Sequence, residues 1–228
     1  MRTRVPSKVE DGMGAMNIVN LLRVNEKLTA IYGKDPIVFG GVAVWLMTGT
    51  PREPSTGPYE RRTDMDFFVP GMTKEYALRM KEQDLNISDS LDRHCYVYYK
   101  VSASEKVPVD LVSFDVSFFG IPYRVIESNT LRLHLEADGK LNEEFGRTGQ
   151  LTVVSPSILT ILKTRSLGRK RPSDAEDLGR LLDFHWEGSA LRFIEENGEV
   201  ISTALNGNAS DVSALKRSLE IFGMSRRK

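Results

Sequence analysis

Two aspartates spaced two residues apart, Asp64 and Asp66, have the arrangement expected of metal ligands. Side chains on a β-strand alternate between its two faces, so an Asp-x-Asp pair on a strand directs both carboxylates the same way. Two carboxylates this close repel each other unless a cation lies between them, and their hard oxygens suit Mg²⁺ or Mn²⁺. The alternative is that both acids face solvent on a half-exposed strand, because short motifs have many false matches.

A double glycine, Gly40-Gly41, precedes the aspartates at the end of an apolar run. Glycines at a strand-to-helix turn let the backbone approach a ligand, and a helix N-terminus presents free N–H groups and a positive dipole end. The pair therefore predicts a phosphate site, with a tight turn that binds nothing as the alternative. Neither Gly-x-x-x-x-Gly-Lys nor Gly-x-Gly-x-x-Gly occurs in the chain, so the site is not a P-loop.

The neighbouring sequence predicts the elements that position these motifs. Residues 36–39 are typical of a short buried strand, and residues 40–47 are expected to form a helix that starts at the glycines. Residues 64–69 predict a strand with both aspartates on one face. Residues 48–62 are rich in Gly, Pro, Ser, Thr and Arg and are expected to form a long exposed loop.

The rest of the chain predicts a mixed front part and a helical back part. Helices are expected over residues 16–32, 73–83, 189–196 and 211–222, with two more starting at Ser155-Pro156 and at Ser173, and strands over 94–101, 107–114, 123–126 and 131–135. The fold class is therefore α+β. Residues 1–13 are expected to be disordered, followed by an α/β domain over 14–150 and a helical domain over 151–228.

Composition narrows the classes of partner. The 31 basic and 31 acidic side chains give a formal net charge of +0, so the chain has no global field to attract nucleic acid, and any such contact needs a local patch. Cys95 is the only cysteine, which excludes an internal disulfide and a cysteine metal cluster. No apolar run approaches a membrane span, and residues 1–14 lack a signal-like apolar region, so a cytoplasmic protein with no membrane partner is expected.

A glycine pair that opens a helix, followed by Arg-Thr-Asp-Met-Asp over residues 62–66, resembles the DNA polymerase β-like nucleotidyltransferase superfamily. The resemblance implies a nucleotidyltransferase-type mixed sheet with flanking helices and a third carboxylate on a later strand. Asp110 is the best match, and Asp115 is its competitor. Asp110 is favoured because apolar strand residues flank it, and alternation turns it away from the face of Val109 and Leu111. Its alternative reading is a surface acid at a strand end.

Two motifs in the back part are similar to those of AbiEii-type toxin nucleotidyltransferases. One helix carries Lys163, and the next begins with an Asp-x-x-Asp-Leu pattern at Asp174 and Asp177. Over residues 35–183 the resemblance implies that Lys163 contacts the NTP phosphates and that both aspartates belong to the site. From the residues alone, Lys163 could equally snorkel from its helix, and the acids could serve the helix dipole.

The resemblance implies an enzyme that transfers an NMP from an NTP to an acceptor hydroxyl and releases pyrophosphate. The implied metal ligands, for two Mg²⁺ ions or Mn²⁺ in their place, are Asp64, Asp66 and Asp110, and the implied nucleotide contacts are Gly40, Gly41, Thr63, Lys163, Asp174 and Asp177. The acceptor is left open between RNA such as tRNA, a protein and a small molecule, and an antitoxin-like partner protein would fit a toxin.

Two alternatives stay open: an antibiotic-modifying enzyme of the aminoglycoside type, and a catalytically silent nucleotide-binding protein of the same fold. The family of tRNA nucleotide-adding enzymes fits less well. Its members have Arg-Asp in the helix after the glycine pair, whereas residues 42–45 here are Val-Ala-Val-Trp. Tyr96, Tyr98 and Tyr99 are expected on a sheet face, with a platform that stacks on a base as the less favoured alternative.

Overall fold

The computed structural model of the chain describes residues 2–4, 18–49, 64–91, 94–113, 121–136, 149–167, 172–183, 187–199 and 209–226. The chain divides into two compact units. The first combines Met1–Asp115 with Leu131–Val153, and the second combines Val116–Thr130 with Val154–Lys228. The predicted domain boundary at residue 150 precedes this division by a few residues of one strand.

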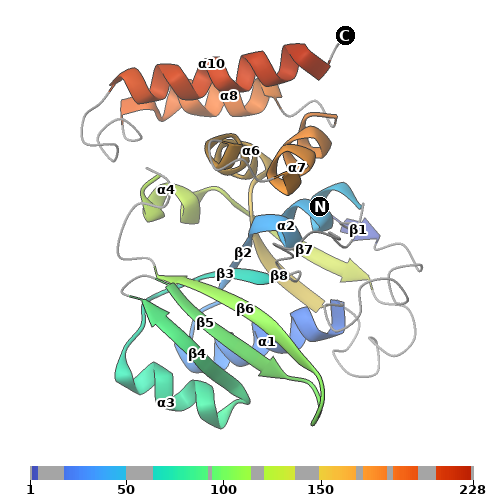
Figure 1. Cartoon of the computed structure of the whole chain (residues 1–228), viewed down its shortest axis with the longest axis vertical. Coiled ribbons are helices and arrows are strands. Elements are labelled where there is room, and N and C mark those ends of the chain that lie inside the picture. The colour runs from blue at the N-terminus through green and yellow to red at the C-terminus, as the bar shows by residue number, and fades with distance from the viewer. Residues whose placement is uncertain are drawn as a thin grey trace. The chain divides into compact units, whose positions relative to one another are not determined.

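The first unit is built on a mixed sheet, which the described residues show with eight strands in the order β1-β7-β8-β2-β3-β6-β5-β4 (Figure 1). The strands are β1 (Arg2–Arg4), β2 (Ile37–Phe39), β3 (Met65–Val69), β4 (Leu85–Leu91), β5 (His94–Lys100), β6 (Lys106–Ser113), β7 (Thr130–Glu136) and β8 (Gly149–Val154). The pairs β1–β7, β2–β8 and β3–β6 are parallel, and β2–β3, β4–β5 and β5–β6 are antiparallel. The sheet confirms the predicted α+β class.

Helices α1 (Ile18–Tyr32), α2 (Gly40–Thr48) and α3 (Lys74–Glu82), labelled in Figure 1, fall within the residue range of the same unit. The Tyr32 and Tyr76 rings of α1 and α3 lie 4.5 Å apart, and Arg79 Nη1 donates a hydrogen bond to the Ile31 carbonyl oxygen at 3.1 Å. Lys27 Nζ lies 5.7 Å from the centre of the Tyr99 ring on β5. Helix α1 therefore lies against the face of the sheet that carries Tyr99.

Alternation along β3 follows the predicted pattern. Met65, Phe67 and Val69 are fully buried, whereas Asp66 between them is half-buried. Phe68, on the Asp66 face, stacks on Phe39 with 4.0 Å between ring centres. One face of β3 is therefore core, and the other passes from aromatic packing at Phe68 to a carboxylate at Asp66.

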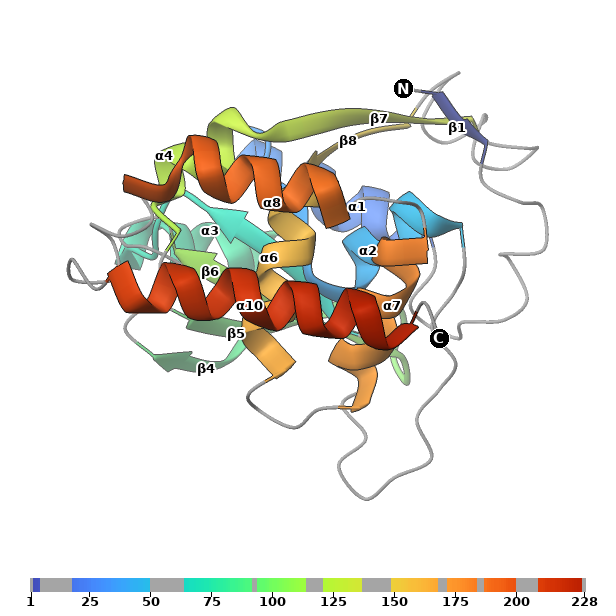
Figure 2. The ribbon, with the colours of Figure 1, turned by 90° about the horizontal axis from the view of Figure 1, so that it is seen from above.

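The second unit is helical, and from Val154 onward it agrees with the predicted helical C-terminal part. It also includes Val116–Thr130, which the sequence placed in the front domain. Its described helices are α4 (Tyr123–Ser128), α6 (Pro156–Ser166), α7 (Pro172–Asp183), α8 (Glu187–Glu196) and α10 (Ala209–Arg226). Ser155 caps α6 as predicted, because its Oγ accepts a hydrogen bond from the Ile158 N–H at 3.4 Å and proline follows it. Helices α8 and α10 lie side by side (Figure 2), and Lys216 Nζ lies 3.4 Å from Glu195 Oε1 between them.

Several local predictions are wrong. Residues 123–126 form helix α4 instead of a strand, since one apolar pair, Val125-Ile126, fits either structure. Arg2–Arg4 form β1 beside β7, within the range 1–13 that was expected to be disordered, and the rest of that range lies outside the described residues. Strands β4 and β8 were not predicted. No described helix is both long and apolar enough to cross a membrane.

Candidate functional site

A single row of residues crosses the centre of the sheet from β2 to β5. Strand pairing places Phe39 opposite Asp66, Asp66 opposite Asp110, and Asp110 opposite Tyr96. Side chains of directly paired residues emerge on the same face of a sheet. Asp66 and Asp110 therefore share a face, and their strands are about 4.8 Å apart.

Gly40 begins α2 immediately after this row, with φ at +69°. A Cβ atom at Gly40 would lie 1.9 Å from Asp66 Oδ2 and 2.9 Å from Asp66 Cβ. Any residue other than glycine would thus have an unfavourable backbone conformation here, and its Cβ would overlap the Asp66 carboxylate. The close approach that the glycine pair predicts is real, and the group that uses it in this structure is the Asp66 side chain.

The start of α2 is a favourable place for negative charge. The side chain of its N-cap residue, Phe39, makes no capping hydrogen bond, and the first turn holds no acidic residue of its own. The N–H groups of a first helical turn have no partners within the helix, and the helix dipole there favours an anion. Asp66 meets this helix start from β3, so its carboxylate lies at a point of positive potential.

Asp110 is the more enclosed of the two paired acids. Its relative exposure is 8%, whereas Asp66 and Asp64 are half-buried. Val109 and Leu111 on either side of Asp110 are buried. Asp64 lies one residue ahead of β3, whose first residue is Met65, so the register pairs Asp66 and not Asp64 with Asp110.

In the described ranges, no group of three or more His, Cys, Asp and Glu side chains is close enough together to hold a metal ion. The pair Asp66 and Asp110 still fits one mode of Mg²⁺ binding. Magnesium is commonly held by one or two carboxylates, with waters and substrate phosphates as the other ligands. The donor chemistry thus suits a cation that arrives with a phosphate substrate, and the two-ion site stays a prediction.

Lys163, Asp174 and Asp177 form a cluster of their own in the helical unit. Lys163 Nζ on α6 lies 2.9 Å from Asp174 Oδ1 and 2.7 Å from Asp177 Oδ2 on α7, and all three side chains are buried. Spacing of three residues puts both aspartates on one face of α7. The triad links two helices with one positive and two negative charges. The predicted contact of Lys163 with NTP phosphates stays a prediction.

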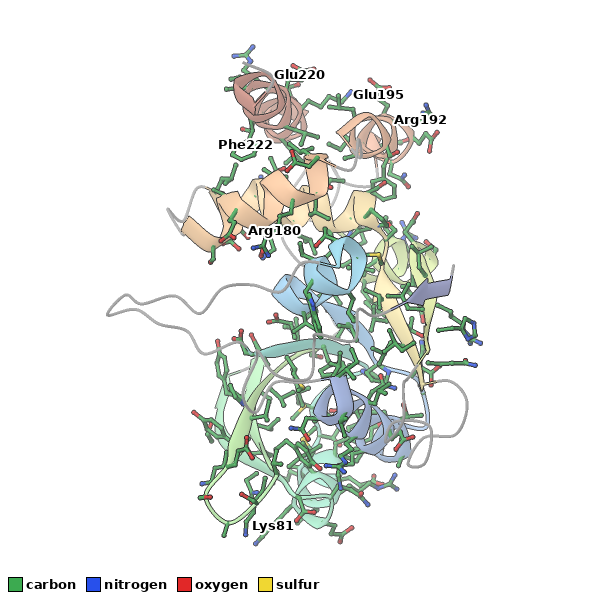
Figure 3. The ribbon with its side chains drawn as sticks, turned by 90° about the vertical axis from the view of Figure 1, so that its right-hand side faces the viewer. Lys81, Arg180, Arg192, Glu195, Glu220 and Phe222 are labelled. Atoms are coloured by element: carbon green, nitrogen blue, oxygen red, sulfur yellow. The ribbon has the colours of Figure 1, made fainter. Side chains whose placement is uncertain are left out.

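A second ion pair on α7 has a different character. Arg180, labelled in Figure 3, pairs with Glu176 one turn earlier on the same helix. Glu176 is exposed, and such surface pairs contribute little to stability. The buried triad is therefore the electrostatic feature of α7 that matters for the fold of this unit.

Several predicted site features lie outside the described residues. These are Thr63, Asp115, most of the loop over 48–62, and the basic stretch after residue 167. Gly41 lies in the first turn of α2 and is half-buried.

Tyr96 is the member of the row that sequence reasoning did not connect with the carboxylates. A signal for it exists in the hairpin between β5 and β6, where Lys100 pairs with Lys106. In an antiparallel pair, four residues back along one strand face four residues forward along the other, which makes Tyr96 the partner of Asp110. The connection must be recognised as a tight hairpin before this count can be made.

The chain is similar to a solved structure but not to a known sequence family. No family model matches the chain, and no curated protein sequence matches it. A solved structure described as "an antigenic nucleotidyltransferase-like protein from Paracoccidioides brasiliensis" aligns over 88% of this chain and 91% of that chain. The two are 14% identical in sequence, with a TM-score of 0.45.

Proposed function

We propose that this chain is a nucleotidyltransferase that moves an NMP from an NTP to an acceptor hydroxyl and releases pyrophosphate. The observation that carries the proposal is the position of Asp66, between the start of α2 at Gly40 and Asp110 on β6. Phosphoryl transfer needs little covalent chemistry from a protein, and depends on positioning and on neutralising charge. A helix start for phosphate next to two carboxylates for a cation supplies both.

Each residue has a role that follows from its place in the row. The N–H groups at Gly40 and Gly41 would donate to phosphate oxygens, since a helix start is suited to anions. Asp66 and Asp110 would hold Mg²⁺, and Asp64, two residues before Asp66, is a further candidate ligand. When bound, this ion would neutralise phosphate charge and lower the pKa of a coordinated hydroxyl. The oxygen of the acceptor hydroxyl would form a bond to the α-phosphorus while the bond from phosphorus to pyrophosphate breaks. Asp110 would accept the proton that this hydroxyl loses.

The order of the motifs supports the same activity. A glycine pair, an Asp-x-Asp strand and a third aspartate on the parallel neighbouring strand follow one another as the resemblance to the polymerase β-like superfamily implies. The AbiEii-type resemblance favours an RNA acceptor such as tRNA and a toxin held in check by a partner protein.

The test is Mg²⁺-dependent transfer of label from α-labelled NTPs to acceptors, with Asp66→Asn and Asp110→Asn as the variants. Loss of a charge-stabilising group at a reaction centre costs about 10²- to 10³-fold in rate, and this loss is expected in both. Asp84→Asn is the matched control, because Asp84 is exposed and its φ of 61° suits asparagine. Labelling that persists in both site variants would reject the assignment.

The choice of acceptor separates the remaining alternatives. RNA, protein and aminoglycosides are offered in parallel with the same NTPs. Label on an aminoglycoside alone would identify an antibiotic-modifying enzyme. Mg²⁺-dependent NTP binding in calorimetry, with no transfer to any acceptor, would identify a silent nucleotide-binding protein.

A further inference from the structure

Strand β5 carries two tyrosines on the same face as the paired carboxylates. Tyr96 lies opposite Asp110, and Tyr98, two residues on, lies opposite Pro108. Both rings are half-buried, whereas Cys95, Val97 and Tyr99 are buried on the other face. The row of acids thus continues one strand further as partly accessible aromatic surface.

The same face becomes basic at its far end. Lys100 and Lys106 lie directly opposite each other at the last pair of the β5–β6 ladder, and both are exposed. Neither ammonium forms an ion pair within the part of the chain that the structure describes. Like charges directly opposite each other on a sheet are unfavourable, and an anion between them would relieve the repulsion. Along β5 from the position opposite Asp110, this face therefore carries Tyr96, then Tyr98, and then the lysine pair.

The direction of nucleotide transfer decides which substrate meets this surface. In phosphoryl transfer the attacking and leaving oxygens lie roughly in line on opposite sides of the phosphorus. The phosphate-binding helix α2 starts from β2, and the sheet order continues β2-β3-β6-β5. Pyrophosphate bound at the start of α2 therefore leaves on the β2 side, and the acceptor oxygen must approach from the β6 and β5 side.

We infer that Tyr96 and Tyr98 are the acceptor-binding platform, that they stack on bases at the end of a single-stranded RNA acceptor, and that Lys100 and Lys106 contact its phosphates. This inference rests on the proposed function. Tyr96 lies one strand spacing, about 4.8 Å, from the strand of Asp110. A ribose spans a similar length, so a base on Tyr96 brings its own sugar hydroxyl to Asp110. The run from Tyr96 to Lys100 is about 14 Å long, enough for a short RNA end.

Other acceptors fit this surface less well. An aminoglycoside is polycationic, and paired lysines would repel it. A protein acceptor with a serine or tyrosine hydroxyl would need neither a second stacking ring nor the two lysines that suit an anion. Aromatic faces beside a basic groove are the usual composition of surfaces that bind single strands without sequence preference.

Binding is measured by fluorescence anisotropy with a labelled single-stranded RNA of about a dozen nucleotides and the full chain, without NTP. Loss of stacking on one base weakens binding by about 5- to 100-fold, and Tyr96→Leu and Tyr98→Leu are each expected to raise Kd within this range. Tyr96→Phe keeps the ring and is expected to bind like the unaltered chain. Thermal melting checks that each variant is folded.

The lysines are tested by salt titration. Two phosphate contacts contribute about 1.4 to the slope of log K against log salt for a single strand, and Lys100→Gln with Lys106→Gln is expected to remove this contribution. Lys81→Gln on α3 (Figure 3) is the matched control, since Lys81 is exposed and does not belong to the β5–β6 ladder. It is expected to leave the slope unchanged.

The outcomes separate this inference from the proposed function. If Tyr96→Leu and Tyr98→Leu both bind RNA as tightly as the unaltered chain, the inference is overturned. It is also overturned if these variants raise only the KM for NTP. Neither result affects Asp66-dependent transfer. Ring-dependent RNA binding with no transfer from any NTP overturns the proposed function instead, because the binding assay needs no turnover.

Discussion

Replacement of Gly40 by alanine tests the geometry of the site most directly. The added Cβ would lie 1.9 Å from Asp66 Oδ2, so the carboxylate must move by more than 1 Å to reach ordinary contact. Rotation of the Asp66 side chain is not sufficient, because its own Cβ would lie 2.9 Å away. The backbone at the start of α2 must therefore shift as well.

The expected loss has two parts that can be separated. Alanine at a positive φ costs about 1–2 kcal/mol of stability, or about 2–4 °C in Tm per kcal/mol for a chain of this size. Misplacing a catalytic group by about 1 Å costs about 100-fold in rate. Gly40→Ala is therefore expected to lower Tm by several degrees and to lower kcat/KM for NMP transfer by about 100-fold.

Gly49→Ala is the matched control. Gly49 has the same φ of +69°, at the other end of the same helix, and a Cβ there would meet nothing within 4 Å. It carries the same backbone strain without displacing Asp66. Both variants are compared by thermal melting and by steady-state labelling with α-labelled NTP. The reasoning is refuted if Gly40→Ala and Gly49→Ala have equal Tm and also equal kcat/KM for NMP transfer.

A double variant adds a second check. When two residues act through one interaction, their effects are not additive. Gly40→Ala combined with Asp66→Asn is thus expected to be no slower than Asp66→Asn alone. Independent losses that multiply would show that Gly40 acts on something other than Asp66.

The remaining predictions concern stability. Lys163→Met leaves two buried carboxylates without their cation, which is expected to cost about 3–5 kcal/mol in urea unfolding, whereas Lys216→Met at an exposed ion pair is expected to cost less than about 1 kcal/mol. Equal losses in the two would contradict a structural role for the triad. Thr73→Ala removes the Oγ that accepts from the Tyr76 N–H and is expected to cost about 1 kcal/mol, with Thr73→Ser near neutral in the same assay.

The centre of the sheet was accessible from the sequence because its signals are local. Alternation at Met65, Asp66 and Phe67 fixes which side chains share a face, and Gly40 marks a turn that admits no side chain. Ser155 followed by proline marks a helix start in the same way. Each signal is contained in a few neighbouring residues, so no tertiary contact was needed to read it.

The features that the sequence did not predict either have too short a local pattern or depend on contact between separate elements. β4 is an edge strand in which Leu85 and Ile87 alternate with Asn86 and Ser88, but Asp89 interrupts the pattern where the register with β5 shifts. The alternating run is therefore too short to predict a strand. The link from Lys163 to Asp174 and Asp177 joins two helices, and charge alone does not distinguish a buried triad from a solvated one. Val125-Ile126 in α4 is too short a run to have a period.

The parallel pairing of β2 with β8 has a consequence for how the protein is made. Ile37 and Val38, which lead into Gly40, pair with Thr152 and Val153. Contacts between segments so far apart in the chain form slowly, because a long loop must close first. A chain emerging from the ribosome completes β2, β3 and β6 well before β8, so the strand that carries the glycine turn has only one of its two neighbours during that interval. The central sheet is complete only when residue 153 has been added, which couples completion of the site to synthesis of about two thirds of the chain.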